Sequence, residues 1–225
     1  MTALHTALPA DLLYGRLLAT AAQHVLGGGP PPRARVRSAD GTLEPLPLDR
    51  WVGAADAADT EVLELAEPSV LDLGCGPGRH LAALRACGKV ALGVDLSPVA
   101  VRLASRRGAA AIPGDVFGDV PWAGRWRTAL LMDGNVGIGG APEALLRRTR
   151  ELLAPGGAAL VELDPPGAPT LCTRLRIEAP GVVSEWFRWA RVGVDGIEPL
   201  AARAGLPVED LRCPGGRWLA RLRRP

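Results

Sequence analysis

The sequence predicts an α/β protein with a central, mostly parallel β-sheet that helices cover on both faces. Three observations support this prediction. From residue 69 onward, short apolar runs alternate with stretches of helical spacing, the order that βαβ units require. The first run leads into three closely spaced glycines, in "VLDLGCGPGRH" (70–80). The chain has 225 residues, 48% of them hydrophobic, which is enough to bury one full core.

The first 66 residues lack this alternation and predict an N-terminal helical cap, which leaves 67–225 for the sheet domain. Leucines at helical spacing predict a helix over 8–25, which ends at "GGGPPP" (27–32). A second helical stretch is expected over 49–66. These pieces are too short for an independent domain, so we expect them to cover part of the sheet.

The alternating part predicts a sheet whose helices connect its strands with right-handed crossovers. Ligands of such sheets bind beyond the carboxyl ends of the strands, so candidate site residues are sought there. The predicted strands span 70–73, 90–95, 109–115, 128–133 and 158–164, and the predicted helices span 79–87, 98–107 and 142–153.

After Asp164 the pattern loosens. Two apolar stretches predict a two-stranded insertion near 168–192, and a helix is expected over 196–204. Apolar and polar residues then alternate on both sides of "PGG" (214–216), which predicts a C-terminal antiparallel hairpin. The insertion carries three aromatic residues that either form an apolar lid over a substrate or pack onto the sheet: Trp186, Phe187 and Trp189.

The glycine turn indicates close approach between the backbone and a ligand. Gly74 can adopt the positive φ of a tight turn, and at Gly76 and Gly78 the missing side chains let N–H groups approach a ligand. A dinucleotide fingerprint would have its third glycine one residue later, where Arg79 stands. Asp72 at the strand end disfavours a phosphate and suits a cationic group. A plain tight turn and a dinucleotide site stay open here, but an amino-acid moiety carrying a cation fits better.

At these residues the chain resembles motif I, D/E-x-G-x-G-x-G, of the class I S-adenosylmethionine-dependent methyltransferases. Further along, "GVDLSP" (93–98), "PGDVF" (113–117) and "LLAPGGAALVELD" (152–164) resemble the family's second-strand end, third-strand end and helix–turn–fifth-strand segment. The resemblance covers about 69–164. It implies a Rossmann-like class I methyltransferase sheet, S-adenosylmethionine as cofactor, and in-line methyl transfer to a small organic acceptor.

The resemblance also implies a cofactor site. Asp95 would bind the ribose hydroxyls, because two acceptor oxygens suit a vicinal diol. Asp115 would accept a hydrogen bond from the adenine amino group, and Val116 would supply a backbone N–H. The complete set of predicted cofactor-binding residues is Asp72, Gly74, Cys75, Gly76, Gly78, Asp95, Leu96, Asp115, Val116 and Asp133.

The predicted catalytic residues, Asp133 and Asn135, follow the fourth strand in "LLMDGNVGIGG" (130–140). This position lies beside the expected methyl donor, where either side chain could orient the acceptor. The alternative is a flexible connection in which Asp133 only forms a turn or caps a helix.

The expected partner is a small molecule rather than a nucleic acid. The 26 basic and 24 acidic side chains nearly balance. "DPPG" (164–167) resembles the D/N-P-P-aromatic signature of amino methyltransferases that act on nucleobases or protein amides, but it follows the fifth strand, and Gly167 replaces the aromatic residue. We interpret it as a rigid turn. The C-terminal arginines form either a basic patch or a solvated strand face: Arg212, Arg217, Arg221, Arg223 and Arg224.

No metal site is expected, because the four cysteines match no zinc spacing. They are typical of buried thiols in a reducing cytosol. The first thirty residues contain Asp11 and Arg16 and lack a signal-peptide core, and no apolar run is long enough for a membrane span. We therefore expect a cytoplasmic protein, whose oligomeric state the sequence does not indicate. Two other hypotheses stay open: a non-catalytic S-adenosylmethionine-binding protein and a nicotinamide-dependent oxidoreductase.

Overall fold

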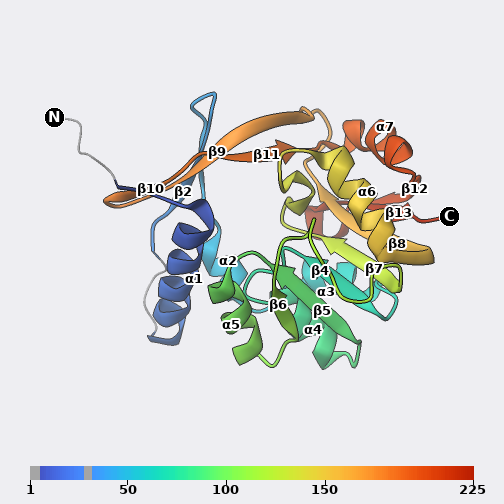
Figure 1. The fold of residues 1–225 in the computed structure, drawn as a ribbon, viewed down its shortest axis with the longest axis horizontal. Coiled ribbons are helices and arrows are strands. Elements are labelled where there is room, and N and C mark those ends of the chain that lie inside the picture. The colour runs from blue at the N-terminus through green and yellow to red at the C-terminus, as the bar shows by residue number, and fades with distance from the viewer. Residues whose placement is uncertain (1–5, 28–31) are drawn as a thin grey trace.

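The computed structural model describes residues 6–27 and 32–225, and it confirms the predicted Rossmann-like sheet (Figure 1). Seven strands lie in the order β12-β13-β8-β7-β4-β5-β6. The pairs among β4 to β8 are parallel, and the C-terminal hairpin adds two antiparallel strands at the β8 edge. The strands are β4 (Val70–Leu73), β5 (Ala91–Asp95), β6 (Ala111–Pro113), β7 (Trp126–Leu131), β8 (Leu153–Leu163), β12 (Val208–Arg212) and β13 (Trp218–Arg223).

Helices cover both faces of this sheet, because successive strand residues point to opposite sides. On β7, Leu130 belongs to the apolar cluster that contains α3 and α4, whereas Leu131 belongs to the cluster that contains α6 and α7. Both leucines are fully buried, which explains the continuous apolar character of the strand. The helices are α3 (Ala57–Glu64), α4 (Arg79–Ala86), α5 (Pro98–Arg106), α6 (Pro142–Leu152) and α7 (Val194–Ala204).

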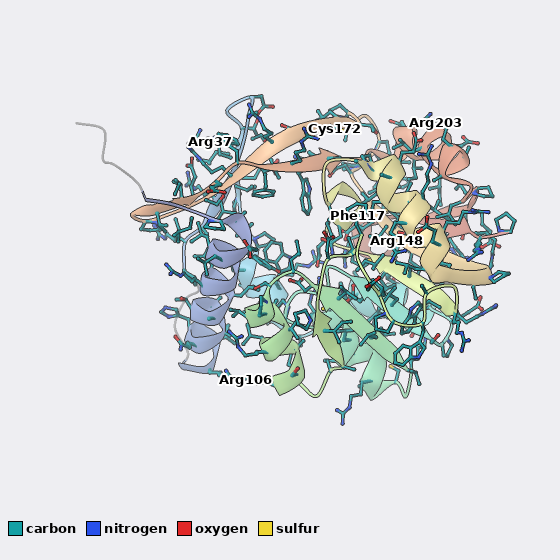
Figure 2. The ribbon with its side chains drawn as sticks, viewed as in Figure 1. Arg37, Arg106, Phe117, Arg148, Cys172 and Arg203 are labelled. Carbon is teal, nitrogen blue, oxygen red and sulfur yellow. The ribbon has the colours of Figure 1, made fainter. Side chains whose placement is uncertain are left out.

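A second sheet, which we call the roof sheet, joins the N-terminal segment to the insertion. Its strands lie in the order β1-β10-β9-β2-β3, and β11 also pairs with β9. In Figure 1 the arm of β9 and β11 runs across the molecule toward α1, and Figure 2 labels Cys172 on β9 and Arg37 on the neighbouring strand β2. The elements are β1 (Thr6–Leu8), β2 (Arg35–Ser38), β3 (Leu43–Pro45), β9 (Leu171–Ala179), β10 (Val182–Ser184), β11 (Phe187–Arg191), α1 (Ala10–Gly27) and α2 (Leu48–Val52).

The roof sheet corrects the description of the N-terminal segment as purely helical. The segment contains the predicted helices, but it also contains three strands that the sequence does not predict, β1, β2 and β3. Each is only three or four residues long, and β2 pairs with β9 from the far end of the chain, so no local pattern marks it. The helix expected over 49–66 is in fact two helices, α2 and α3, because the chain turns at Gly53. Residues 28–31 of the predicted break lie outside the described residues.

The start of α3 matters for the site because it fixes a buried carboxylate. Asp56 caps the helix by accepting a hydrogen bond from Asp59 N (2.7 Å), and the Asp59 side chain accepts one from Asp56 N (3.0 Å). This reciprocal arrangement satisfies two backbone donors that a helix start leaves unpaired. It also directs the Asp59 carboxylate, which is fully buried, toward α4.

Candidate active site

A cavity of about 1100 Å³ lies between the carboxyl ends of the parallel strands and the roof sheet. Its floor consists of the residues that follow β4 to β8, while α1 and α2 contribute Tyr14 and Trp51 at one side. Nine predicted site residues from separate parts of the chain therefore meet in one space: Gly74, Cys75, Gly76, Asp95, Leu96, Asp115, Val116, Asp133 and Asn135.

All three glycines of the turn have positive φ, at +78°, +53° and +79° for Gly74, Gly76 and Gly78. Their surroundings differ. A Cβ at Gly74 would lie 2.7 Å from Asn135 Nδ2, and one at Gly78 would lie 2.7 Å from the Cβ of Ala104 on α5. At Gly76 a Cβ would meet only the Tyr14 hydroxyl, at 3.1 Å. Gly76 is thus the position where the turn stays open toward the cavity.

The N–H groups of the turn do not behave as the sequence led us to expect. Gly76 N donates to Asp95 Oδ2 (2.8 Å), and Gly78 N donates to Cys75 O (3.1 Å). Gly78 also lies outside the cavity lining, so its role is to let α4 and α5 pack closely. These N–H groups are used within the protein, so Gly76 contributes open space rather than a free donor, and Gly78 contributes close packing.

Two backbone hydrogen bonds fix the orientation of the Asp95 carboxylate at the end of β5. Its Oδ2 accepts from Gly76 N and its Oδ1 accepts from Ser97 N (2.8 Å). Burial raises the pKa of Asp95 above its ordinary value, while the two backbone hydrogen bonds oppose that shift. Each oxygen keeps a second lone pair, and the residue lines the cavity. The carboxylate can therefore accept two further hydrogen bonds from a diol.

Asp72 lies behind the turn rather than on the cavity wall. It is 1% exposed, and its Oδ2 has no hydrogen-bond partner among the described residues. The imidazole of His80 is close to this oxygen, with its Nδ1 3.7 Å away. A buried carboxylate oxygen without a donor suits a cationic or N–H-bearing ligand group, so Asp72 remains a predicted cofactor contact.

The remaining predicted cofactor residues offer a mixed surface. Leu96 is 59% exposed although it is apolar, and it adjoins Asp95 at the cavity edge. Asp115 accepts from Phe117 N (2.9 Å), which orients its carboxylate beside the buried Val116. Burial raises the pKa of the Cys75 thiol, with a further contribution from nearby carboxylates, so the thiol is neutral. Apolar faces beside a directed carboxylate suit a purine base.

Sequence reasoning missed a network of buried charges beside this surface. Arg79 pairs with both Asp59 and Asp133, and Arg217 pairs with Asp59, Asp133 and Glu162. Burial alone would raise the pKa of Asp59, but hydrogen bonds from His80 and Arg79 outweigh it and hold that pKa well below its ordinary value. The network joins α3, α4, β8, the loop after β7 and the start of β13.

Arg217 also settles one open alternative about the C-terminal arginines. Its side chain is only 10% exposed and donates to Glu162 Oε1 at 2.8 Å. Arg221 and Arg223 donate to carboxylates on neighbouring segments. These three arginines are therefore neither a free basic patch nor simply a solvated strand face.

The loop after β7 places Asp133 and Asn135 at the floor of the cavity. Asp133 has a φ of +53°, unusual for a residue with a side chain, and its N–H donates to Glu162 Oε2 (2.6 Å). Asn135 Nδ2 donates to Leu73 O and Gly74 O, both at 2.9 Å. Both residues are thus fixed in orientation, and Asn135 ties this loop to the glycine turn.

His80 is a buried imidazole between two carboxylates. Its Nε2 lies 3.3 Å from Asp59 Oδ1, and its Nδ1 faces Asp72. Burial lowers the pKa of His80, but the two carboxylates outweigh burial and raise it to about 9. His80 is therefore protonated, as an imidazolium, at neutral pH.

The raised pKa of His80 predicts a pH-dependent stability. Because the pKa of His80 is higher in the folded than in the unfolded chain, protonated His80 stabilises the fold. This stabilisation is complete below the unfolded pKa near 6.5 and is lost as the pH rises through about 9. Compared with His80→Gln, the wild-type chain should lose roughly 2–3 kcal/mol of unfolding free energy across that window. Urea unfolding of both proteins at several pH values measures this difference. If the stabilities of the two proteins depended on pH in the same way, the pKa of His80 would not be raised in the folded chain.

Two other sequence expectations concern segments near the roof. Residues 164–167 form the predicted turn, in which Ala168 N donates to Pro165 O (3.0 Å). Phe187 and Trp189 line the cavity, whereas Trp186 does not, so the lid alternative fits the first two.

In residues 6–27 and 32–225, no cluster of His, Cys, Asp or Glu could hold a metal ion, and no helix has the length and apolar content to cross a membrane.

Together, the strand order, the glycine turn and the directed carboxylate at the second strand end define a nucleoside-binding α/β enzyme of the class I methyltransferase type. A family model described as "Methyltransferase domain" matches residues 53–195, which is more than half of the chain. The chain belongs to this family. It is an S-adenosylmethionine-dependent methyltransferase, and its cofactor is S-adenosylmethionine.

Solved structures share the fold. A methyltransferase from Bacteroides fragilis, in complex with S-adenosyl-L-homocysteine, is 24% identical with a TM-score of 0.76, and the match covers 97% of each chain. The 1,6-didemethyltoxoflavin-N1-methyltransferase of Burkholderia thailandensis is 18% identical with a TM-score of 0.59, covering 97% of this chain and 92% of that one. DesVI of Streptomyces venezuelae is 23% identical with a TM-score of 0.56, covering 74% and 90%. The search of curated proteins gave no match.

Proposed function

We propose that this enzyme methylates a small organic molecule that binds beneath the roof sheet. The observation that carries the proposal is this cavity, which has eight of the ten predicted cofactor residues on its floor and apolar side chains of the roof sheet above them. The roof sheet leaves space for a compact molecule, since four of its strands, β2, β3, β9 and β11, border the same cavity as α1 and α2. The Burkholderia structure with bound 1,6-didemethyltoxoflavin supports this class of acceptor.

S-adenosylmethionine supplies an electrophilic methyl group when bound. An acceptor heteroatom would give its lone pair to this methyl group, the C–S electron pair would stay on sulfur, and the acceptor's proton would pass to solvent. Residues of this chain contribute mainly by orienting the reactants, which can provide about 7–11 kcal/mol. Asp95 would hold the ribose, Asp115 and Val116 the adenine, and Asp72 the cationic amino-acid end.

Asp133 and Asn135 are proposed to orient the acceptor rather than to remove its proton. Both carboxylate oxygens of Asp133 already face guanidinium groups, those of Arg79 and Arg217. Because both oxygens are engaged in these ion pairs, we assign Asp133 an orienting role rather than proton removal. Among the described residues, Asn135 forms side-chain hydrogen bonds only through Nδ2, which leaves its carbonyl oxygen for a further partner.

A labelling experiment tests the small-molecule assignment. The purified enzyme is incubated with S-adenosylmethionine labelled on its methyl group and with a cell extract separated into small molecules, nucleic acids and proteins. Label should enter the small-molecule fraction and depend on active enzyme. Label confined to nucleic acid or protein would contradict the proposal. Calorimetry with S-adenosylhomocysteine and with NAD distinguishes a methyltransferase from an oxidoreductase. We expect S-adenosylhomocysteine to bind and NAD not to bind.

Asn135→Ala should lower turnover of the acceptor more than it lowers donor affinity, because orientation acts mainly in the transition state. We expect kcat to fall about tenfold, while the dissociation constant for S-adenosylhomocysteine changes less. Steady-state kinetics with the acceptor found by labelling, together with calorimetry, measure both quantities. An equal loss in both would instead show that Asn135 acts through the glycine turn to which it is bonded.

A further inference from the structure

The inner face of the roof sheet forms an apolar ceiling over the cavity. Residues directly opposed in antiparallel strands share one face of a sheet. Phe187 opposes Leu175, and Val36 opposes Ile177. All four line the cavity, as does Trp189, which lies two residues beyond Phe187 and so points the same way. The ceiling is therefore built from alternate residues of three strands.

Aromatic side chains are concentrated around this space. Four of the nine aromatic residues in the chain line the cavity. Phe187 and Trp189 meet edge to face on the ceiling, with ring centroids 6.2 Å apart, and Tyr14 and Trp51 do so at the side, 5.8 Å apart. Their exposed ring surfaces favour a flat ring as the occupant, since aromatic groups pack well on one another.

The charges around the cavity disfavour an acidic occupant. Arg79 is occupied by two carboxylates of the buried network, and Arg191 donates to Asp164 (2.9 Å) and Glu44 (2.8 Å). Arg188 also lines the cavity, but it is exposed and alternates with the ceiling residues along β11. Two of the three arginines that line the cavity are thus paired with carboxylates, and acidic side chains outnumber arginines in the lining.

We infer that the acceptor is a planar aromatic or heteroaromatic molecule without an acidic group, methylated on a heteroatom of the ring or attached to it. The inference rests on the proposed small-molecule function and names its substrate class. The flat ring would lie against Phe187 and Trp189, with its nucleophilic atom toward the floor that carries Asp133 and Asn135. The bond changes are those of the methyl transfer described above.

Binding of three matched probes to the enzyme saturated with S-adenosylhomocysteine tests this inference. The probes are 2-naphthol, 2-naphthoate and decahydro-2-naphthol, which share a bicyclic frame and differ in charge or flatness. 2-Naphthol should bind saturably, the anionic 2-naphthoate more than roughly tenfold more weakly, and the saturated alcohol roughly fivefold more weakly. Equal or tighter binding of the naphthoate or the saturated alcohol, or no binding of 2-naphthol, overturns the inference.

Variants locate the probe. Phe187→Ala should weaken 2-naphthol binding roughly fivefold or more and leave the S-adenosylhomocysteine affinity unchanged. Trp186→Ala is the matched control, because Trp186 is the adjacent aromatic residue and lies outside the cavity lining. Equal effects of the two variants place the ring elsewhere and overturn the inference. Failure of S-adenosylhomocysteine itself to bind would instead contradict the donor site, and thus the proposed function, independently of the probe results.

Discussion

Replacing Arg79 by methionine should lower the free energy of unfolding by about 3 kcal/mol, the largest stability effect that we expect from a single site. Arg79 is 3% exposed, and its partner Asp59 is fully buried. Breaking a buried pair typically costs about 3–5 kcal/mol, because one charge is left without compensation. The lower end applies here, since Arg217 and His80 remain beside Asp59.

Arg85→Met provides the matched control for this prediction. Arg85 lies on the same helix, α4, but is exposed, so its replacement should change stability by less than about 0.5 kcal/mol. Urea unfolding of the three proteins measures the difference. A loss for Arg79→Met no greater than that for Arg85→Met would mean that the buried network does not stabilise the fold.

Asp95→Ala should weaken S-adenosylhomocysteine binding by roughly 1.5–3 kcal/mol, about 10- to 150-fold in the dissociation constant. The physical reason is the loss of an oriented, charged acceptor whose geometry is set by Gly76 N and Ser97 N. Isothermal titration calorimetry measures the affinity. Asp119→Ala serves as the control, because Asp119 is exposed and lies outside the cavity lining.

Because Asp95→Ala also leaves two backbone donors unpaired, circular dichroism must show that the variant is folded before its affinity is interpreted. Asp95→Asn supplies a milder change that retains one side-chain acceptor at this position. It should lie between the wild type and Asp95→Ala in affinity. Unchanged affinity in folded Asp95→Ala would show that the ribose is held elsewhere.

The parts of the fold that the sequence predicts are those with local signals. The run "VLDL" and the glycines after it define a strand and a turn within ten residues, and the structure has β4 and α4 at these positions. The same holds for β5 and α5, where Ser97 and Pro98 mark the helix start. Since parallel strands end at one edge of the sheet, the gathering of Gly76, Asp95 and Asp115 follows from the strand order.

The buried network and the roof sheet depend instead on contacts between distant parts of the chain. Asp59 and Arg217 are 158 residues apart, and each has a local interpretation that hides the pairing. Asp59 is a typical capping-box residue near a helix start, and Arg217 precedes an alternating strand like any solvated arginine. Likewise, the pairing of Arg37 with Glu178 across β2 and β9 spans 141 residues. No local periodicity specifies such contacts.

A crystal structure of the enzyme with S-adenosylhomocysteine tests the central claim most directly, because the claim is that donor and acceptor share the cavity beneath the roof sheet. The account predicts that the ribose hydroxyls lie within hydrogen-bond distance of the Asp95 carboxylate and that the adenine lies beside Asp115 and Val116. The sulfur should face the space below Phe187 and Trp189. A ligand whose ribose avoids Asp95, or whose sulfur points away from that space, would contradict the account.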